Sequence, residues 1–393
     1  MPSPDTDKII ERLARQRVET QSWGYVSTGT RFKVFHTPGT PRTVYEKIDD
    51  ASLVHQLTGI APTVALHIPW DRVEDFPKLA AYAVKSGLRI GSISPNLFQD
   101  DDYRLGSLTN VKPTVHKKAL DHILECIDIM KQVGSSQLSL WFADGTNYPG
   151  QGDFRTRRHY LLEGLQAVYA ALPDYAVILL EYKFYEPAFY HTDIADWGQS
   201  LLLCQKLGPR AGVLVDIGHH AQGVNIEHIV ATLLDEQRLA GFDLNSKKYG
   251  DDDLFLGAID PQQLFLIAVE LVTAEDDPDG SVRDAAHKVL YKIDQCAMVE
   301  DKIPAMLRSV TALQTAFAKA LLVDRPLLHY MRQEGDVVGA NDVLNDAYET
   351  DVRPILAMVR EKLDVPSDPL RAYRDSGAQA ERNKTRVGTP AGW

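Results

Sequence analysis

The sequence is poor in the features that mark several large classes of protein. Its 393 residues include three cysteines, Cys126, Cys204 and Cys296, which lie far apart and form no C-x-x-C pair. Cysteines with this spacing predict reduced thiols without a zinc role. The formal charge is −12 and no cluster of lysine and arginine interrupts it. This balance argues against nucleic acid or an anionic membrane as the main partner.

Long apolar runs and the common phosphate-binding glycine patterns are also missing. No apolar stretch approaches the roughly 18 residues of a membrane span, and the start, MPSPDTDKII, is too polar for a secretory signal. We therefore expect a soluble protein of the cytoplasm. No expected strand is followed by G-x-G-x-x-G, and G-x-x-x-x-G-K-S/T does not occur. The usual sequence signals for cradling phosphate groups are thus absent.

The chain does contain a regular alternation of strand and helix candidates. Apolar residues make up 44% of it, enough for one large α/β core with an appendage. Strands are expected at 62–70, 89–96, 137–145, 175–183, 212–217, 239–245 and 287–295. Helices are expected at 5–19, 75–87, 117–133, 154–172, 195–207, 225–237 and 262–273. Segment 22–35 holds either the eighth strand or a loop over the site. Eight such parallel units predict a closed (β/α)8 TIM barrel.

Four regions follow from this pattern. Residues 1–60 are expected to form an N-terminal helix and a β/loop segment that leads into the barrel, and residues 61–300 form the barrel core. Residues 301–372 form an additional helical region, with helices at 301–322, 339–348 and 351–363. Residues 373–393 lack apolar periodicity, which predicts a mobile tail or an arm on a neighbouring subunit.

Four of the expected strands carry an acidic residue close to their carboxyl ends. The four acids are Glu181, Asp216, Asp243 and Asp294. Any one of them could be a helix cap or a turn residue. Together, however, they would gather negative charge at the carboxyl end of one barrel, where burial is costly without a cation or another partner. The four strand ends therefore predict one shared metal site.

A second group of possible ligands is local in sequence. His219 follows Asp216 by three residues, and Asp251 and Asp253 lie in a loop that contains a glycine. Taken alone, a run of three aspartates more often marks a solvated loop, and His220 is interpreted as a satisfied polar group. Carboxylates with imidazole and no thiolate suit Mg²⁺, Mn²⁺ or Co²⁺. The two groups together predict a two-cation site, with Glu181 or Asp216 as the bridge.

Further candidates would contact a substrate. Lys183 lies two residues after Glu181, so both side chains point to the same side of an extended strand. Its ammonium could hold a substrate oxygen or the charge that develops on it. Three aromatic residues lie near expected strand ends: Trp70, Phe98 and Trp141. Such residues are core by default, but beside His67 and Asp144 they could form the apolar wall of a sugar pocket.

Several stretches are long enough to identify a family. They are Trp23-Gly24, GTRFKVF, ALHIPWD, FQDDDY, LWFADGTNYPGQ, EYKFYEPAFYHTD, VDIGHHA, KYGDDDL and ALLVD. Together they resemble the bacterial L-rhamnose isomerases of the broad-specificity type, relatives of xylose isomerase. The resemblance runs over nearly the whole chain, from about Glu19 to about Ala372. It implies a (β/α)8 barrel, a homotetramer, and interconversion of an aldose with its 2-ketose. It also implies two divalent cations per subunit, Mn²⁺ before Mg²⁺ or Co²⁺.

The resemblance implies roles for individual residues. A structural cation that also binds substrate oxygens would be held by Glu181, Asp216 and Asp294. A mobile catalytic cation would be held by His219, Asp251 and Asp253. Lys183 would contact the monosaccharide, and His67, Trp70 and Trp141 would line its pocket. The sugars in view are L-rhamnose, L-mannose, D-allose and L-lyxose.

Two positions depart from the family pattern. GFDLN places Asp243 where many members have a metal-binding imidazole, and DQCAM places Ala297 where they have a histidine. Asp243 can still be a ligand, and an oxygen in place of a nitrogen favours harder ions such as Mg²⁺ and Mn²⁺. Ala297 removes a polar group near the expected site, which could widen the pocket or change the preferred sugar.

The resemblance favours a hydride shift between C2 and C1 of the sugar. Proton transfer through an enediol stays open, with Asp294 or Asp251 as the base, and His67 is a candidate for opening the sugar ring. A sugar epimerase or a barrel-type endonuclease would use the same fold. The first needs two opposed bases, and the second a basic surface and more histidine ligands. A sugar-binding relative without catalytic activity is a further alternative. The presence of Lys183, His219, Asp251 and Asp253 argues against it, because a non-catalytic barrel would not need this cluster of charges.

Overall fold

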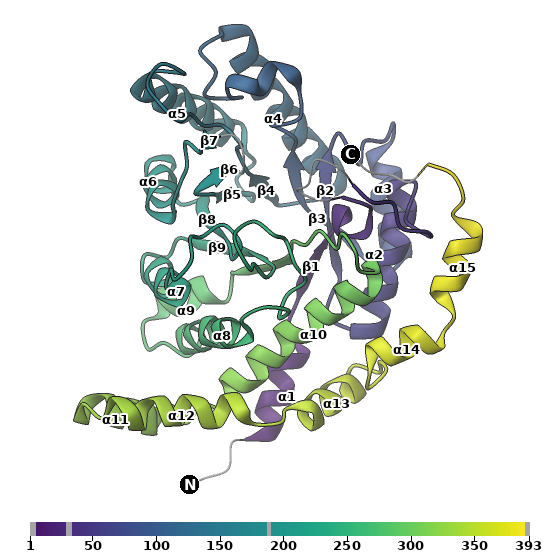
Figure 1. Cartoon of the computed structure of the whole chain (residues 1–393), viewed down its shortest axis with the longest axis vertical. Coiled ribbons are helices and arrows are strands. Elements are labelled where there is room, and N and C mark those ends of the chain that lie inside the picture. The colour runs from purple at the N-terminus through teal and green to yellow at the C-terminus, as the bar shows by residue number, and fades with distance from the viewer. Residues whose placement is uncertain (1–4, 29–33, 187–189, 390–393) are drawn as a thin grey trace.

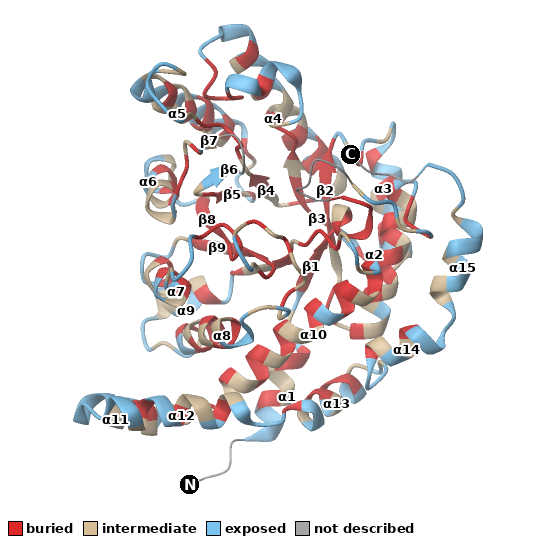
Figure 2. Cartoon of the chain, in the orientation of Figure 1, coloured by how far each residue is buried: buried red, intermediate tan, exposed pale blue. Residues whose placement is uncertain are grey.

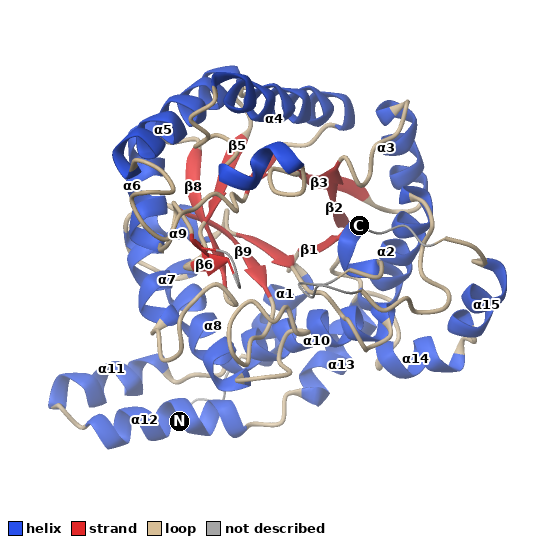
Figure 3. Ribbon diagram, turned by 45° about the horizontal axis from the view of Figure 1, so that its top comes forward, coloured by secondary structure: helices blue, strands red, loops and turns tan. Residues whose placement is uncertain are grey.

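A closed barrel of eight parallel strands forms the centre of the molecule. The computed structural model describes residues 5–28, 34–186 and 190–389. The strands are β1 (Val18–Gln21), β2 (Thr63–Ile68), β3 (Arg89–Pro95), β4 (Gln137–Leu140), β5 (Val177–Glu181), β8 (Ala211–Asp216), β9 (Leu239–Leu244) and β10 (Leu290–Ile293). They close in the order β1-β10-β9-β8-β5-β4-β3-β2 (Figure 3). The predicted (β/α)8 TIM barrel is confirmed.

Helices follow the strands and surround the barrel (Figure 1). They are α2 (Val44–Thr58), α3 (Phe76–Lys85), α4 (Pro113–Val133), α5 (Phe154–Ala171), α6 (Trp197–Leu207), α7 (Ile226–Asp235), α8 (Pro261–Glu275) and α9 (Gly280–Ala286). Local sequence sets several of their ends. Asp196, for example, accepts a hydrogen bond from the backbone N–H of Gln199 and so caps α6. The strands are buried while the outer faces of the helices are exposed (Figure 2), as expected for a parallel sheet covered by helices.

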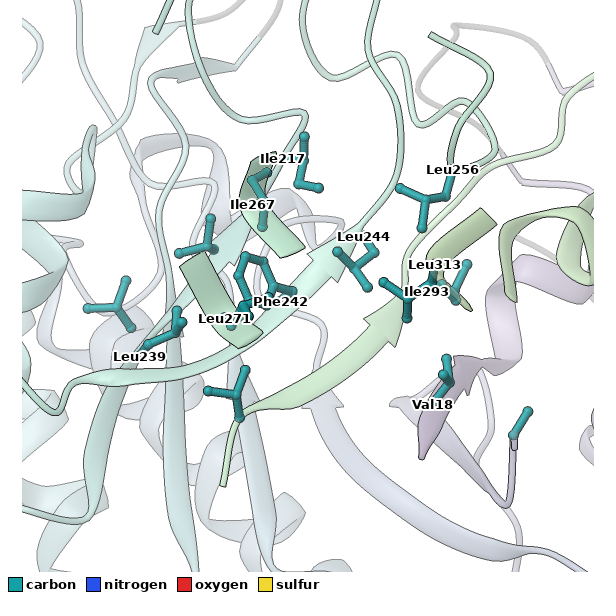
Figure 4. Close-up of a cluster of buried hydrophobic side chains, with 14 of the residues drawn as sticks. Val18, Ile217, Leu239, Phe242, Leu244, Leu256, Ile267, Leu271, Ile293 and Leu313 are labelled. Carbon is teal, nitrogen blue, oxygen red and sulfur yellow. The ribbon is translucent and has the colours of Figure 1, made fainter. Parts of the chain in front are cut away.

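Alternation along the strands directs acidic groups to the inside of the barrel. Phe242 and Leu244 of β9 and Ile293 of β10 belong to the hydrophobic core, in which Figure 4 also labels Leu271 and Leu313. Successive side chains of a strand point to opposite faces. Asp243, between Phe242 and Leu244, therefore faces the barrel interior. The core thus positions the charged residues that lie between its own members.

The first strand lies earlier than the sequence suggested. Helix α1 (Thr6–Ala14) ends before β1, and a short 3-10 helix, η1 (Ser22–Tyr25), follows the strand. The possibility of a strand within 22–35 was therefore wrong for the described part of that segment, and residues 29–33 lie outside the described residues. The polar sequence of β1 hid it. Its Glu19 is buried because the backbone N–H of Ser92 donates a 3.0 Å hydrogen bond to it. The absence of a side chain at Gly91 provides the space for the Glu19 carboxylate, since a Cβ at this position would lie 1.5 Å from Oε2 of Glu19.

The additional C-terminal helices are present as expected. They are α10 (Lys302–Leu321), α11 (Arg325–Glu334), α12 (Val337–Glu349), α13 (Arg353–Lys362), α14 (Pro369–Asp375) and α15 (Ala378–Thr385). Helices α11 and α12 form a pair that projects from the barrel (Figure 1). The division into four regions stays a prediction, although β1 already lies within residues 1–60. Among the described helices, none combines the length and apolar character needed to cross a membrane.

A helix that the composition did not predict lies within residues 373–389. Helix α15 occupies part of the expected tail and is tied to α2 by two arginines. Arg382 and Arg386 approach the buried carboxylate of Asp50 to 2.8 and 2.7 Å. Ion pairs with a distant helix are invisible to a search for apolar periodicity, which explains why this helix was missed.

Candidate functional site

A cavity of about 450 Å³ opens at the carboxyl ends of the barrel strands. Its lining includes most of the predicted site residues: His67, Trp70, Phe98, Trp141, Glu181, Lys183, His219, Asp243, Asp251, Asp253 and Asp294. Asp216, the remaining one, is fully buried and lies within reach of the others. The barrel therefore brings together the residues predicted for the site, although their individual roles stay predictions.

Strand ends supply two overlapping groups of possible cation ligands. Glu181 ends β5, Asp216 ends β8, and Asp243 lies on β9 opposite Asp216. One group consists of Glu181, Asp216 and His219, and the other of Asp216, Asp243 and Asp294; within each, the ligand atoms lie within 4.8 Å of one another. Asp216 belongs to both groups. Of the two bridging residues left open by the sequence, Asp216 has the position that a bridge requires.

The electrostatics of these acids fit a divalent cation. Burial raises the pKa of Asp216 to about 6, with repulsion from Glu181 adding to the shift. Burial likewise raises the pKa of Asp243 to about 8, against the attraction of Lys292. Burial and the neighbouring carboxylates raise the pKa of Asp294 well above its ordinary value. Carboxyl groups that repel one another in this way are relieved by a bound cation, and oxygen ligands with one imidazole suit a hard divalent ion.

His219 lies among the acids with both of its ring nitrogens, and its Nδ1 is 3.1 Å from Oε1 of Glu181. Its Nδ1 lies 3.0 Å from the carbonyl oxygen of Tyr182, which can only accept a hydrogen bond, so Nδ1 carries the proton. Its Nε2 lies 2.9 Å from Oδ1 of Asp251. A backbone partner on one nitrogen is the usual way to present the other to a metal. Burial alone would lower the pKa of His219, but Asp216 and the other carboxylates outweigh it and raise this pKa well above the ordinary value.

The three consecutive aspartates do not behave alike. Asp251 and Asp253 are buried and have positive φ angles of 55° and 47°. Asp252 points back to its own loop, where its carboxylate accepts hydrogen bonds from the backbone N–H groups of Tyr249 (2.7 Å) and Gly250 (3.3 Å). The middle residue therefore shapes the loop, and the outer two present their side chains to the cavity. A freely solvated run does not describe this segment.

Lys183 is held at the wall of the cavity. Its ammonium nitrogen lies 2.7 Å from Oδ2 of Asp251 and 2.9 Å from Oε2 of Glu186. It also lies 5.0 Å from the ring centre of Trp141. Burial would lower the pKa of Lys183, but the charges of Asp251 and Glu186 raise it overall. A charged donor is thus fixed beside the possible ligands, where it can contact a substrate oxygen.

Aromatic rings form another part of the cavity wall. His67 stacks on Trp70 with ring centres 3.9 Å apart, and Phe98 lies edge-on to Trp141 at 4.7 Å. Trp70, Phe98 and Trp141 are partly exposed, as residues that face a cavity should be. Burial lowers the pKa of His67 well below its ordinary value, so its imidazole is neutral near pH 7. These residues therefore line a pocket, where the default interpretation made them core.

Two expectations near this wall need correction. Asp144 accepts hydrogen bonds from the backbone N–H groups of Ser107 (2.7 Å) and Thr109 (3.0 Å), so it anchors that loop instead of facing the aromatic wall. Ala297 is buried, and within the described residues its neighbour Cys296 is the one that lines the cavity. Ala297 is therefore not among the described residues that line this cavity, and its effect on sugar preference stays a prediction.

Sequence reasoning missed several residues that contact the predicted ligands. Trp23 donates a 2.8 Å hydrogen bond from Nε1 to Asp294. Gln21 donates one of 2.8 Å from Nε2 to Asp243, and Lys292 lies 3.1 Å from the same carboxylate. Lys292 lies within the apolar strand expected at 287–295, and a lysine in such a strand is a sequence signal for a buried charged contact. The contacts of Trp23 and Gln21 depend on the position of β1, which the sequence did not reveal.

Comparison with known proteins agrees with this geometry. Residues 57–265 match the family described as xylose isomerase-like TIM barrel. A probable sugar isomerase of Rhizobium meliloti (strain 1021) is 42% identical over 381 residues, which cover 96% of this chain and 87% of that protein. The xylose isomerase of Thermus thermophilus is 28% identical over 245 residues, which cover 57% of this chain and 62% of that protein.

Solved structures add a likeness of fold alone. An L-ribulose 3-epimerase superposes with a TM-score of 0.54 at 12% identity, covering 82% of this chain and 98% of that one. A 3-keto-D-glucoside 4-epimerase from E. coli superposes with a TM-score of 0.53 at 13% identity, covering 77% of this chain and 100% of that one. Identities this low carry no argument about substrate or reaction.

Proposed function

Because the chain belongs to the xylose isomerase-like TIM-barrel family, we propose that it is a metal-dependent isomerase that interconverts an aldose and its 2-ketose. The observation that carries the proposal is the convergence of Glu181, Asp216 and His219 at the floor of a cavity with an aromatic wall. Ligands for a cation and an apolar surface for a sugar ring are thus found in one place.

We further propose two divalent cations per subunit, with Mn²⁺ preferred over Mg²⁺ and Co²⁺. The first would be held by Glu181, Asp216, Asp243 and Asp294, and the second by His219, Asp251 and Asp253. When bound, such cations would polarise the carbonyl and hydroxyl oxygens at C1 and C2 of the sugar. Asp216 belongs to both groups of neighbouring ligand atoms, which supports a bridging role for this residue between the two cations.

The residues of the chain account for the remaining requirements of the reaction. In a hydride shift, the hydrogen on C2 moves to C1, the proton of the C2 hydroxyl leaves, and a proton reaches O1. Lys183 can hold the charge that develops on these oxygens, because its ammonium lies at the wall next to Asp251. Asp251 and Asp294 are the carboxylates that could accept a proton if the reaction instead passes through an enediol.

Ring opening and substrate choice are assigned to the aromatic wall. The neutral imidazole of His67 can exchange a proton with O5 of a cyclic sugar, and the indole ring stacked on it shields this step from water. We propose that the substrate is of the L-rhamnose type, with L-mannose, D-allose and L-lyxose as further candidates. The support is the set of family-like stretches that surround the cavity, ALHIPWD and LWFADGTNYPGQ among them.

We also propose that the protein acts as a homotetramer. The paired helices α11 and α12 expose Tyr330, Val337 and Val338, whose exposed fractions are 55%, 77% and 72%. Apolar side chains on a projecting helix pair suit a contact between subunits. Light scattering of the purified protein tests this, and a monomeric mass would overturn it.

The proposed reaction is tested by measuring ketose formation from L-rhamnose, L-mannose, D-allose and L-lyxose. The protein is stripped with EDTA and then supplied with Mn²⁺, Mg²⁺ or Co²⁺. Metal-dependent ketose formation is expected, and Glu181→Gln should abolish it together with metal binding. Glu227→Gln, on the outer helix α7, serves as the matched control. An epimer as the product, or sugar binding without turnover, would overturn the isomerase proposal.

A further inference from the structure

A row of charged residues crosses four neighbouring strands at the base of the pocket. In the register of the barrel, Glu19 of β1 lies beside Lys292 of β10. Lys292 lies beside Asp243 of β9, and Asp243 lies beside Asp216 of β8. The interior of a TIM barrel is usually filled by branched apolar residues. A lysine in this row is therefore a specific feature, and its surroundings indicate what it does.

Lys292 is almost completely enclosed and has partners on two sides of the barrel. Its side chain is 1% exposed. Its Nζ lies 3.1 Å from Oδ1 of Asp243 and donates a 3.0 Å hydrogen bond to the hydroxyl of Ser139 on β4. A buried ammonium is costly unless a partner compensates it. Asp243 provides that partner in direct contact.

Among the residues that the structure describes, the partners of the Asp243 carboxylate all lie at one oxygen. Gln21 donates a 2.8 Å hydrogen bond from Nε2 to Oδ1, the same atom that Lys292 approaches. Two donors on one oxygen fix the plane of the carboxylate. Oδ2 is then the oxygen that Asp243 can offer to a cation shared with Asp216 and Asp294, the two acids with which it forms a ligand group.

We propose that Lys292 is a positioning residue for the cation site, and that Lys292 and Asp243 act together as one neutral ligand. Lys292 and Gln21 hold Oδ1 so that Oδ2 remains available, and the ammonium cancels the charge that Asp243 adds to a floor already formed by Glu181, Asp216 and Asp294. This inference rests on the proposed function, because it requires that the carboxylate cluster binds a cation.

A purely structural role is the alternative. Glu19 could be the group that needs Lys292, since the two residues are neighbours in the register. Glu19, however, already accepts a 3.0 Å hydrogen bond from the backbone N–H of Ser92 and a second from its hydroxyl. The closest carboxylate to Lys292 is that of Asp243. A structural role predicts that removing Lys292 has the same effect whatever residue stands at position 243.

A double-mutant cycle on Mn²⁺ affinity separates the two interpretations. Isothermal titration at one pH compares the parent protein, Lys292→Met, Asp243→His and the double variant. Histidine is a neutral residue that can also bind a metal. It can therefore substitute for the neutral pair of Lys292 and Asp243 only when the charge of Lys292 has also been removed. Asp243→His alone should weaken Mn²⁺ binding about tenfold or more, because Lys292 is left uncompensated beside the cation.

The effect of Lys292→Met should depend on its partner. With Asp243 present, it should weaken Mn²⁺ binding about threefold or more, because Oδ1 loses a donor that holds it. With Asp243→His, the same substitution should restore most of the lost affinity. The visible spectrum of bound Co²⁺ should change in Lys292→Met and stay close to that of the parent in Lys292→Arg. Equal effects in both backgrounds, with an unchanged Co²⁺ spectrum, would overturn the inference.

Two controls protect the experiment. Lys47 is another buried lysine, paired with Asp71 at 2.6 Å outside the ligand groups. Lys47→Met should lower the unfolding temperature without changing Mn²⁺ affinity. If Lys292→Met does not fold, Lys292→Gln replaces it in both backgrounds. A parent protein that binds Mn²⁺ and isomerises sugars while the cycle is additive would overturn this inference alone. A parent that binds no divalent cation would overturn the proposed function with it.

Discussion

The indole Nε1 of Trp23 donates a 2.8 Å hydrogen bond to Oδ1 of Asp294. Trp23 lies in η1 directly after β1, and Asp294 follows β10, so the bond joins the ends of two neighbouring strands. The same indole lies edge-on to His67, with ring centres 5.4 Å apart. One side chain thus connects a possible cation ligand with the aromatic wall of the pocket.

Replacing Trp23 by phenylalanine tests this connection. The ring is kept and the donor is lost, so Oδ1 of Asp294 is no longer held in place. We expect Mn²⁺ affinity to fall about fivefold, the equivalent of one ordinary hydrogen bond, with little change in unfolding temperature. Titration calorimetry measures the affinity, and Trp197→Phe on helix α6 is the matched control. Unchanged affinity in Trp23→Phe would show that this bond does not position Asp294.

The loop with three aspartates allows a comparison within one segment. Asp251→Asn and Asp253→Asn should each weaken binding of the second cation about tenfold or more, because each removes a charged oxygen that faces the cavity. Asp252→Asn should leave binding close to that of the parent, since Asp252 bonds to its own loop. Cation stoichiometry and affinity by titration distinguish the three. If Asp252→Asn weakens cation binding as much as Asp251→Asn and Asp253→Asn do, the proposal that only the two outer aspartates of the loop bind the cation is wrong.

Much of the barrel could be predicted because most strands carry their own pattern. Strands β5, β8 and β9 are apolar runs that each contain or end in an acid, and a parallel barrel brings such ends to one face. The convergence of Glu181, Asp216 and Asp243 follows from that rule without knowledge of any contact. The fold and the location of the site were therefore accessible from local sequence.

Features that depend on contacts between strands could not be predicted. Strand β1 has the polar sequence VETQ. Its Glu19 can be buried because Ser92 of β3 donates a hydrogen bond to the carboxylate and Gly91 of β3 leaves space for it. Gln21 and Trp23 contact ligands only because β1 pairs with β10. Asp144 has the same local context as a pocket residue, but it anchors Ser107 instead. In each case the register of distant strands decides the role.

Lys183 should be required for turnover and not for binding metal. We expect Lys183→Met to lower kcat about a hundredfold or more, because the ammonium near the substrate oxygens is lost, while Mn²⁺ still binds. Steady-state kinetics and titration calorimetry measure the two effects separately. Lys183→Arg keeps the charge and should retain part of the activity. Loss of Mn²⁺ from Lys183→Met would instead assign Lys183 to holding Asp251 in place.

The metal-free protein should lose stability as the pH rises through the pKa values of its buried acids. Burial raises the pKa of Asp216 from 3.8 to about 6 and that of Asp243 from 3.8 to about 8. A carboxyl group whose pKa is higher in the folded state binds its proton more tightly there. Its contribution to stability is complete below pH 3.8, the ordinary value, and disappears as the pH rises through about 6 and about 8. Each tenfold difference in proton affinity between the folded and unfolded states corresponds to about 1.4 kcal/mol of stability.

A bound cation should reverse this trend, because it favours the ionised carboxylates that repel one another without it. The difference in unfolding temperature between Mg²⁺-saturated and EDTA-treated protein should therefore grow as the pH rises from below 6 to above 8. Scanning fluorimetry across this range measures it. Asp216→Asn removes one of the raised groups and should flatten the pH dependence of the EDTA-treated protein. A temperature difference that is the same at every pH would mean that protons and the cation do not compete for these carboxylates.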